Sequence, residues 1–512
     1  MNRQISQVAL VALVLLAALI VATTYWQTWA APGLAAEQDN EIQRVAQFSI
    51  DRGKIFAANG KTVLATNIRK EVDGQTLYLR TYPEAGLASQ VVGYSTTSRS
   101  RAGVERSENS YLTASNDDLS TLIDTVGDRL KGTTIKGNSL VLTLHAGAQR
   151  LADNLLAGSC GAAVVLNPKT GAVDVMASSP GFDPNLIEQP SGYTKIQSTK
   201  SPCPPEPAAP LLNRATQGLY PPGSTFKTIT AAAALDDGVY TPDSTFDDPG
   251  YCTEYGQTIK NALDQSGPEA FGLVNLVEAY QHSINAVFCN IGIKLGAERL
   301  VDEAKKFGFY SVPPLETPSD SRSASGLYQG SKLFDPSNAK QYSEVDPGRT
   351  AFGQGKLLAT PLQMALVAAA VANNGVEMKP TLIKKVLSPG GSVVAKLHPR
   401  VWRQATKPST AGELKNMMVE VVQAGTGTAA QIPGIVVAGK TGTAETCSCN
   451  TVYDAWFIFF APADDPVVAG AVVLEAQNNG FGGAVAAPIA RQLMQAILPT
   501  PSNQSNGANG NH

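Results

Sequence analysis

The chain has 512 residues, of which 43% are hydrophobic and 16% are charged, and its formal net charge is −3. This length suggests two or three domains. A charge so close to neutral excludes a general nucleic-acid binder, because neutralising phosphates needs a basic surface. The 4 histidines show no HExxH or paired spacing, so we expect no metal site and no cofactor.

An apolar segment near the N-terminus predicts a membrane anchor. Residues 8–23 are an almost unbroken run of Val, Leu, Ala and Ile, preceded by Arg3 and followed by Tyr25, Trp26 and Trp29. Such a run with aromatic residues at its end is typical of a membrane span, and the leading positive charge places the N-terminus in the cytoplasm. We expect residues 1–36 to be a cytoplasmic stub and single-pass anchor, with a signal peptide cleaved near residues 30–36 as the alternative.

Residues 37–150 predict a β-rich, non-catalytic domain. Short strand patterns at residues 54–56 and 76–82 are interrupted by turn residues, which is typical of such a module. Because the anchor places this segment outside the cytoplasm, the cysteines of the chain can form disulfides. The 6 cysteines allow 15 pairings, and the sequence does not choose among them.

Residues 151–498 predict an α+β domain. Apolar strand patterns occur at residues 161–166, 172–177, 455–460 and 467–474, and helical patterns at residues 224–237, 273–295, 300–307, 361–373, 411–424 and 486–498. Strands, then helices, then strands favour helices packed on an antiparallel sheet. We expect residues 313–349, rich in Ser, Pro and Asp, to be a loop, and the tail 499–512 to be disordered.

Ser224 and Lys227 form a candidate nucleophile and base. They open an Ala-rich helical pattern directly after Tyr-Pro-Pro-Gly. Side chains three apart share a helix face, so the amine can reach the hydroxyl. A second pair with this spacing, Ser337 and Lys340, lies in the predicted loop, and we interpret it as chance.

A second lysine and a polar triplet complete the candidate site. Lysine acts as a base only when its charged form is disfavoured, by burial or by a nearby cation. Lys440, in Gly-Lys-Thr-Gly-Thr with strand-like flanks, can supply that cation, and its strand edge suits a peptide ending in a carboxylate. Ser283 and Asn285 can both face one cleft only where the backbone turns sharply or where a helix end is exposed. Lys169-Thr-Gly is read as a turn, and His282 as structural.

The three motifs in this chain order resemble the class B penicillin-binding proteins, a transpeptidase family. Flanking blocks strengthen the resemblance: Leu-Asn-Arg-Ala at residues 212–215, Gly-Gln-Gly at 353–355, Ala-Asn-Asn-Gly at 372–375 and Asp-Ala-Trp-Phe at 454–457. The exported segment before residue 150 resembles the pedestal of that class, although Ala57-Ala58 stands where many members carry Asp-Arg. The resemblance therefore implies a membrane anchor, a β-rich pedestal at residues 37–150 and a transpeptidase domain at residues 151–498.

The family resemblance implies a role for each motif residue. Ser224 would attack the D-Ala–D-Ala carbonyl of a peptidoglycan stem peptide, with Lys227 as base, and release D-Ala. Ser283 would relay protons with help from Lys440. Among the substrate-binding residues, Asn285 would hold the acyl-chain amide, and Thr441 and Thr443 would bind the terminal carboxylate. Gly442 would let the backbone of the substrate approach closely.

The resemblance also implies partners. A neighbouring stem amine would resolve the ester, and β-lactams would acylate Ser224 and stall there. A separate glycosyltransferase is expected to supply the glycan strands, because residues 37–150 are too short to polymerise them.

Two other functions are weighed against this one. A D,D-carboxypeptidase would use the same scaffold and differ only in whether water or an amine reaches the ester. Residues 434–441 also fit the nucleotide-binding pattern GxxxxGK[ST]. That pattern requires a helix after the lysine, but the residues that follow here predict none, so a nucleotide-binding protein is disfavoured.

Overall fold

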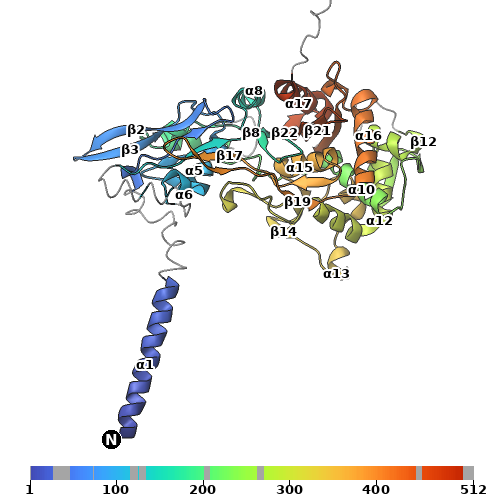
Figure 1. Ribbon diagram of the computed structural model, residues 1–512. Coiled ribbons are helices and arrows are strands. Elements are labelled where there is room, and N and C mark those ends of the chain that lie inside the picture. The colour runs from blue at the N-terminus through green and yellow to red at the C-terminus, as the bar shows by residue number, and fades with distance from the viewer. Residues whose placement is uncertain are drawn as a thin grey trace, which may run out of the picture.

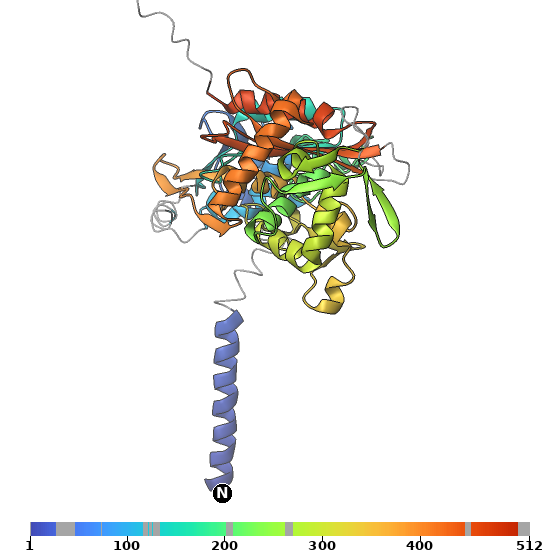
Figure 2. The ribbon, with the colours of Figure 1, turned by 90° about the vertical axis from the view of Figure 1, so that its right-hand side faces the viewer.

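The computed structural model describes residues 2–26, 47–72, 74–115, 121, 125, 134–200, 208–261, 270–445 and 452–499. Two lobes lie side by side in Figure 1, one blue and rich in strands, the other ranging from teal to red and containing most of the helices. Figure 2 faces the helices of the second lobe, with the orange helix α16 (Pro408–Ala424) at the front. The tail 500–512 lies outside the described residues.

Helix α1 (Asn2–Thr24) contains the predicted membrane segment. Its stretch Gln4–Thr24 has a mean hydropathy of 2.8, and the model buries none of it. A helix of this length spans about 30 Å, the thickness of the hydrocarbon core of a bilayer. Both its length and its composition therefore fit a single membrane span.

A five-stranded sheet forms the centre of the second lobe. Its strand order is β20-β21-β22-β7-β8, with all neighbours antiparallel. The strands are β7 (Gly161–Leu166), β8 (Val173–Ser179), β20 (Ala438–Glu445), β21 (Val452–Ala461) and β22 (Val468–Asn478). The prediction of an antiparallel sheet from these apolar runs is confirmed, and β20 forms one edge.

Both faces of this sheet are buried, which explains the continuous apolar runs. Along β21, Trp456 and Ile458 face one core cluster, whereas Phe457 and Phe459 face the other. Because alternate strand residues point to opposite faces, a sheet covered on both sides needs no polar positions. Helices α8 and α17 cover one face and α15 the other; α15 is apolar all round and is buried along nearly its whole length.

The helices of this lobe agree with most of the predicted ranges. They include α8 (Ala146–Leu156), α9 (Gly192–Gln197), α10 (Lys227–Asp236), α11 (Leu276–Gln281), α12 (Asn285–Lys306), α15 (Pro361–Ala372), α16 and α17 (Gly482–Ile497). The single helix predicted at residues 273–295 is wrong: β12 (Gly272–Asn275) precedes α11, and α11 and α12 are separated by a break at residues 282–284. The range 300–307 belongs to α12, which is kinked at Gly296.

The first lobe contains a six-stranded sheet in the order β18-β17-β6-β1-β2-β3. Its strands are β1 (Ile55–Phe56), β2 (Val63–Val72), β3 (Gln75–Thr81), β6 (Ser139–Leu142), β17 (Ile383–Leu387) and β18 (Val393–Lys396). The predicted β-rich character of this lobe is confirmed. Two strands come from beyond residue 150, however, so the C-terminal part of the chain completes the pedestal sheet.

The segment 313–349, predicted as a loop, contains regular structure. It includes β13 (Gly326–Gln329), β14 (Lys332–Phe334), α13 (Ala339–Tyr342) and α14 (Pro347–Ala351). The N-caps Asn338 and Asp346 each accept a hydrogen bond from the backbone of the helix they begin. Asp346 and Pro347, which contributed to the loop prediction, are therefore the cap and the first residue of a short helix.

Candidate active site

Ser224 lies on a tight turn that opens α10. Residues Gly223–Phe226 form the 3₁₀ turn η4, and α10 continues from Lys227. In a 3₁₀ turn, side chains three apart are eclipsed, so the backbone places Lys227 on the same side as Ser224. Ser224 is partly exposed, whereas Lys227 is fully buried.

The Lys227 ammonium group reaches the Ser283–Asn285 segment. Its Nζ donates to the Ser283 backbone oxygen at 2.6 Å, to Asn285 Oδ1 at 2.8 Å and to Ser283 Oγ at 3.3 Å. It also lies 5.3 Å from the centre of the Phe288 ring. The first and second motifs, predicted separately, therefore meet at one point.

Ser283 occupies the break between α11 and α12. Its φ is 57°, a left-handed conformation that costs a non-glycine residue about 1–2 kcal/mol. Helix α11 begins with a capping box of Asn275 and Glu278, and α12 begins at Asn285. This sharp turn lets Ser283 and Asn285 both contact Lys227 Nζ, and it is one of the two arrangements that the sequence analysis allowed.

Lys440 approaches the same serine from the sheet edge. It is fully buried on β20, and its Nζ donates to Ser283 Oγ at 2.8 Å and to the Thr441 backbone oxygen at 3.2 Å. The Nζ also lies 5.4 Å from the centre of the Tyr280 ring. One hydroxyl, that of Ser283, thus joins the lysines of the first and third motifs.

The remaining predicted residues lie on β20 beside the turn that contains Ser224. Thr441 Oγ1 is 2.6 Å from Thr426 Oγ1, and Thr443 Oγ1 accepts a hydrogen bond from Gly482 N at 3.2 Å. A Cβ on Gly442 would lie 2.8 Å from the Pro222 oxygen. Gly442 therefore permits the turn itself to pack against the strand.

A buried polar network that the sequence analysis missed supports the turn before Ser224. Arg214 Nε lies 2.8 Å from Glu475 Oε1, and the Tyr220 hydroxyl donates to the same oxygen. Trp456 Nε1 donates to the Pro221 oxygen at 3.0 Å. A signal existed in the sequence, since Glu475 directly follows the apolar part of β22, but only the fold shows which partners it meets.

The turn also depends on a close backbone approach at Gly353. Gly223 N donates to the Gly353 oxygen at 3.0 Å, and a Cβ on Gly353 would lie 2.0 Å from the Gly223 oxygen. Gly353 also has a φ of +79°, so both the conformation and the available space favour glycine there.

The competing motifs lie elsewhere. Ser337 and Lys340 are exposed at the short helix α13, and Lys169 pairs with Asp465 at the surface. Lys440 is followed by continuing strand up to Glu445 rather than by the helix of a phosphate loop. Among the residues that the structure describes, no three His, Cys, Asp or Glu side chains gather in a way that would hold a metal ion.

Comparison with known proteins decides the family. Residues 161–495 match the model of the penicillin-binding protein transpeptidase domain, and residues 52–140 match the penicillin-binding protein A dimerisation domain. The chain belongs to the penicillin-binding protein transpeptidase family.

Individual members of the family agree over almost the whole chain. The peptidoglycan D,D-transpeptidase PbpA of Mycolicibacterium smegmatis is 33% identical over 97% of this chain and 99% of its own, and PbpA of Mycobacterium tuberculosis is 32% identical over the same shares. The solved ceftriaxone acyl-enzyme of M. tuberculosis penicillin-binding protein A matches with a TM-score of 0.75 and 30% identity, covering 89% of this chain and 100% of that one.

The close approach at Gly353 makes a prediction for this penicillin-binding protein. We expect Gly353→Ala to displace the Gly223 backbone and to slow acylation by penicillin at least about tenfold, measured as a second-order rate constant. Gly355→Ala is the matched control: its φ is +78°, but the nearest atom to the added Cβ, on Arg349, is 3.8 Å away. Equal acylation rates for the two variants would contradict this account of the turn.

A second prediction concerns Asp454 on β21, the strand paired with β20. Burial raises the pKa of Asp454 to about 7, the hydrogen bond from Ala476 N opposes the rise, and the Glu475 carboxylate adds to it. A carboxyl with a pKa raised above its unfolded value of about 3.9 costs stability once it ionises, so stability is lost as pH rises from about 4 to 7.

The variant Asp454→Asn has no proton to lose and keeps an oxygen that can accept from Ala476 N. We therefore expect it to exceed the wild type by roughly 2 kcal/mol in free energy of unfolding at pH 8, and by much less at pH 5. Urea unfolding at both pH values measures this difference. A difference that does not change with pH would show that Asp454 is ionised in the folded protein throughout this range.

Proposed function

We propose that Ser224, Lys227, Ser283 and Lys440 carry out the peptidoglycan D,D-transpeptidase reaction of this family. The observation that carries the proposal is the double contact at Ser283, whose Oγ lies 3.3 Å from Lys227 Nζ and 2.8 Å from Lys440 Nζ. The contact brings residues of all three motifs together around one oxygen, with both lysines fully buried and the partly exposed Ser224 three residues before Lys227.

In the acylation step, Ser224 Oγ attacks the carbonyl carbon of the penultimate D-Ala in a stem peptide. The hydroxyl proton passes to the Lys227 amine, which must be neutral to accept it. Burial and a second ammonium group nearby both disfavour a charged amine, and Lys227 and Lys440 are buried around one oxygen. The cluster therefore favours a state in which one of the two amines is neutral.

Collapse of the tetrahedral intermediate breaks the bond to the terminal D-Ala. The leaving amine needs a proton, and Ser283 Oγ can donate one and recover it from the lysines on either side. The backbone N–H groups of Ser224 and Thr443 are the proposed oxyanion hole, where the loss of one donor costs about 10²–10³ in rate. The hydroxyls of Thr441 and Thr443 hold the terminal carboxylate, and Asn285 holds the acyl-chain amide.

In the second step, an amine of a neighbouring stem attacks the ester. A new amide forms, and Ser224 recovers its proton through Lys227. β-Lactams follow the first step only, because their leaving group stays attached and the acyl-enzyme persists. The D,D-carboxypeptidase alternative differs in this second step, in which water takes the place of the amine.

The chain is proposed to act outside the cytoplasm, held by α1. Arg3 precedes the apolar segment, which places the N-terminus on the cytoplasmic side. The Cys252–Cys289 disulfide supports this topology, because such bonds persist in oxidising compartments. The pedestal sheet and the dimerisation-domain match account for residues 52–140, so we assign glycan polymerisation to a separate glycosyltransferase at the membrane.

The nucleophile assignment predicts that Ser224→Ala abolishes covalent labelling by fluorescent penicillin, because the variant lacks the hydroxyl that attacks the carbonyl carbon. The control is Ser337→Ala, which removes the serine of the second Ser-x-x-Lys pair and should label at the wild-type rate. Gel fluorescence measures the label and thermal unfolding confirms the fold. Persistent labelling of a folded Ser224→Ala protein would contradict the assignment.

Product analysis then separates the two activities. A D-Ala–D-Ala donor is incubated with an amine acceptor, and the products are resolved by mass spectrometry. Transpeptidation gives a cross-linked product with release of one D-Ala, whereas free tetrapeptide as the sole product would favour the carboxypeptidase.

A further inference from the structure

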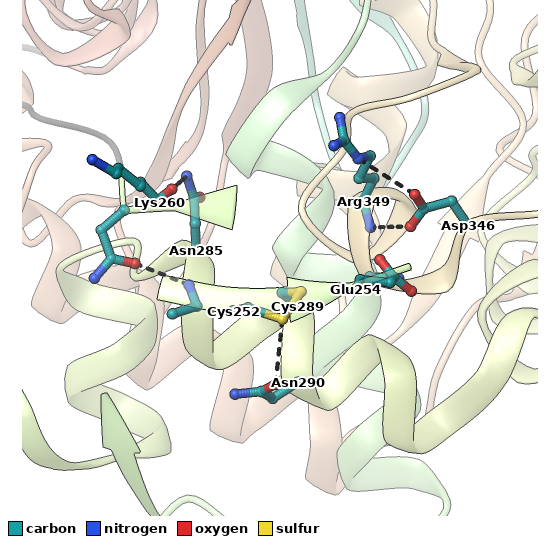
Figure 3. Close-up of a disulfide and its surroundings, with 11 residues drawn as sticks. Cys252, Glu254, Lys260, Asn285, Cys289, Asn290, Asp346 and Arg349 are labelled. Atoms are coloured by element: carbon teal, nitrogen blue, oxygen red, sulfur yellow. Dashed lines mark hydrogen bonds and ion pairs between the residues drawn. A yellow bond between two sulfur atoms is a disulfide. The ribbon is translucent and has the colours of Figure 1, made fainter. Parts of the chain in front are cut away.

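A β-hairpin that no motif includes lies against the Ser283–Asn285 segment (Figure 3). It consists of β10 (Tyr251–Glu254) and β11 (Gln257–Lys260), paired antiparallel, with Tyr251 directly opposite Lys260. Residues opposite each other in such a ladder point to the same face. The hairpin therefore has an inner face with Cys252 and Glu254, and an outer face with Tyr251 and Lys260.

The inner face is fastened to the helices behind it. Cys252 forms a disulfide with Cys289 of α12, and Glu254 Oε1 accepts a hydrogen bond from Gly348 N at the start of α14 at 2.9 Å. Next to the hairpin, Asn261 Oδ1 accepts from Ala286 N at 2.9 Å. These three attachments fix the position of the hairpin relative to the first turn of α12.

The end of the hairpin orients the Asn285 amide. Asn285 Nδ2 donates to the Lys260 backbone oxygen at 3.3 Å, while its Oδ1 accepts from Lys227 Nζ. A side-chain amide has two N–H donors. With one directed at Lys260, the other remains for the acyl-chain carbonyl of a bound donor peptide, which the proposed function places at this residue.

The outer face presents a cation at the residue whose backbone oxygen contacts Asn285. The Lys260 side chain is exposed, and Tyr251 opposite it is 48% exposed. Within the described part of the chain, Lys260 forms no ion pair. In a donor peptide held by Asn285, the residue before the two alanines lies on the side away from Ser224. Its Cα is one bond from the carbonyl carbon of the amide that Asn285 holds. The Lys260 side chain is long enough to reach it.

We propose that Lys260, supported by Tyr251, is a specificity-determining residue that recognises a carboxylate on the stem residue preceding D-Ala–D-Ala. This inference rests on the proposed function and names the chemical class of donor. Stems with a free carboxylate at that residue are favoured over the corresponding carboxamides, because only the carboxylate pairs with the ammonium group.

The test uses two synthetic D-Ala–D-Ala donors that differ only in whether the preceding residue bears a free carboxylate or a carboxamide. The full-length wild-type protein should release D-Ala with a kcat/KM about two- to fivefold higher for the carboxylate, the range expected for an exposed ion pair. Lys260→Gln should remove this ratio, and Lys260→Arg should keep it. High salt should reduce the wild-type ratio, since it screens exposed charges.

Lys332→Gln, an exposed lysine on the distant strand β14, is the matched control and should keep the wild-type ratio. A wild-type ratio near one, or a ratio that survives Lys260→Gln, would overturn the inference. Covalent penicillin labelling of every variant separates this outcome from failure of the proposed function: unlabelled wild type would refute the nucleophile assignment itself.

Discussion

The organisation of this site depends on one hydroxyl held between the side-chain nitrogens of two buried lysines. Lys227 comes from the start of α10 and Lys440 from the edge strand β20, and both donate to Ser283 Oγ. Neither lysine can move independently, because each is fully buried. The turn that contains Ser224, the break between α11 and α12, and the strand β20 must therefore stay fixed relative to one another. Many of the packing contacts described above hold them in this arrangement.

Backbone contacts supply much of this fixed geometry. Gly442 lets β20 pack against the turn, and Gly353 brings a backbone oxygen to Gly223 N. On the other side of the site, the β10–β11 hairpin is attached to α12 and α14, and it presents the Lys260 oxygen to Asn285. The residues that contact substrate in our proposal are thus held in place by close backbone contacts at glycines and by a disulfide, none of which takes part in the reaction.

The sequence predicted the family, the antiparallel sheet and the three motifs because each has a local signature. Ser224 and Lys227 are three apart after Pro-Gly, and apolar strands covered on both faces read as continuous runs. The helical pattern at residues 273–295 did not reveal the break at Ser283, which was suggested only by the requirement that Ser283 and Asn285 face one site. The left-handed turn itself is contacted by Lys227 from a distant helix. Glu475 and the strands β17 and β18 were missed for the same reason: their partners are far away in the chain.

The most direct test of the account is a double-mutant cycle on Ser283 and Lys440, read as the second-order rate constant for acylation by penicillin. Ser283→Ala, Lys440→Met and the double variant are compared with the wild type, and thermal unfolding confirms that each folds. If both residues act through one hydroxyl, the double variant should lose little more than the more severe single variant. Losses that simply add on a logarithmic scale would show that the two residues act independently and would contradict the account.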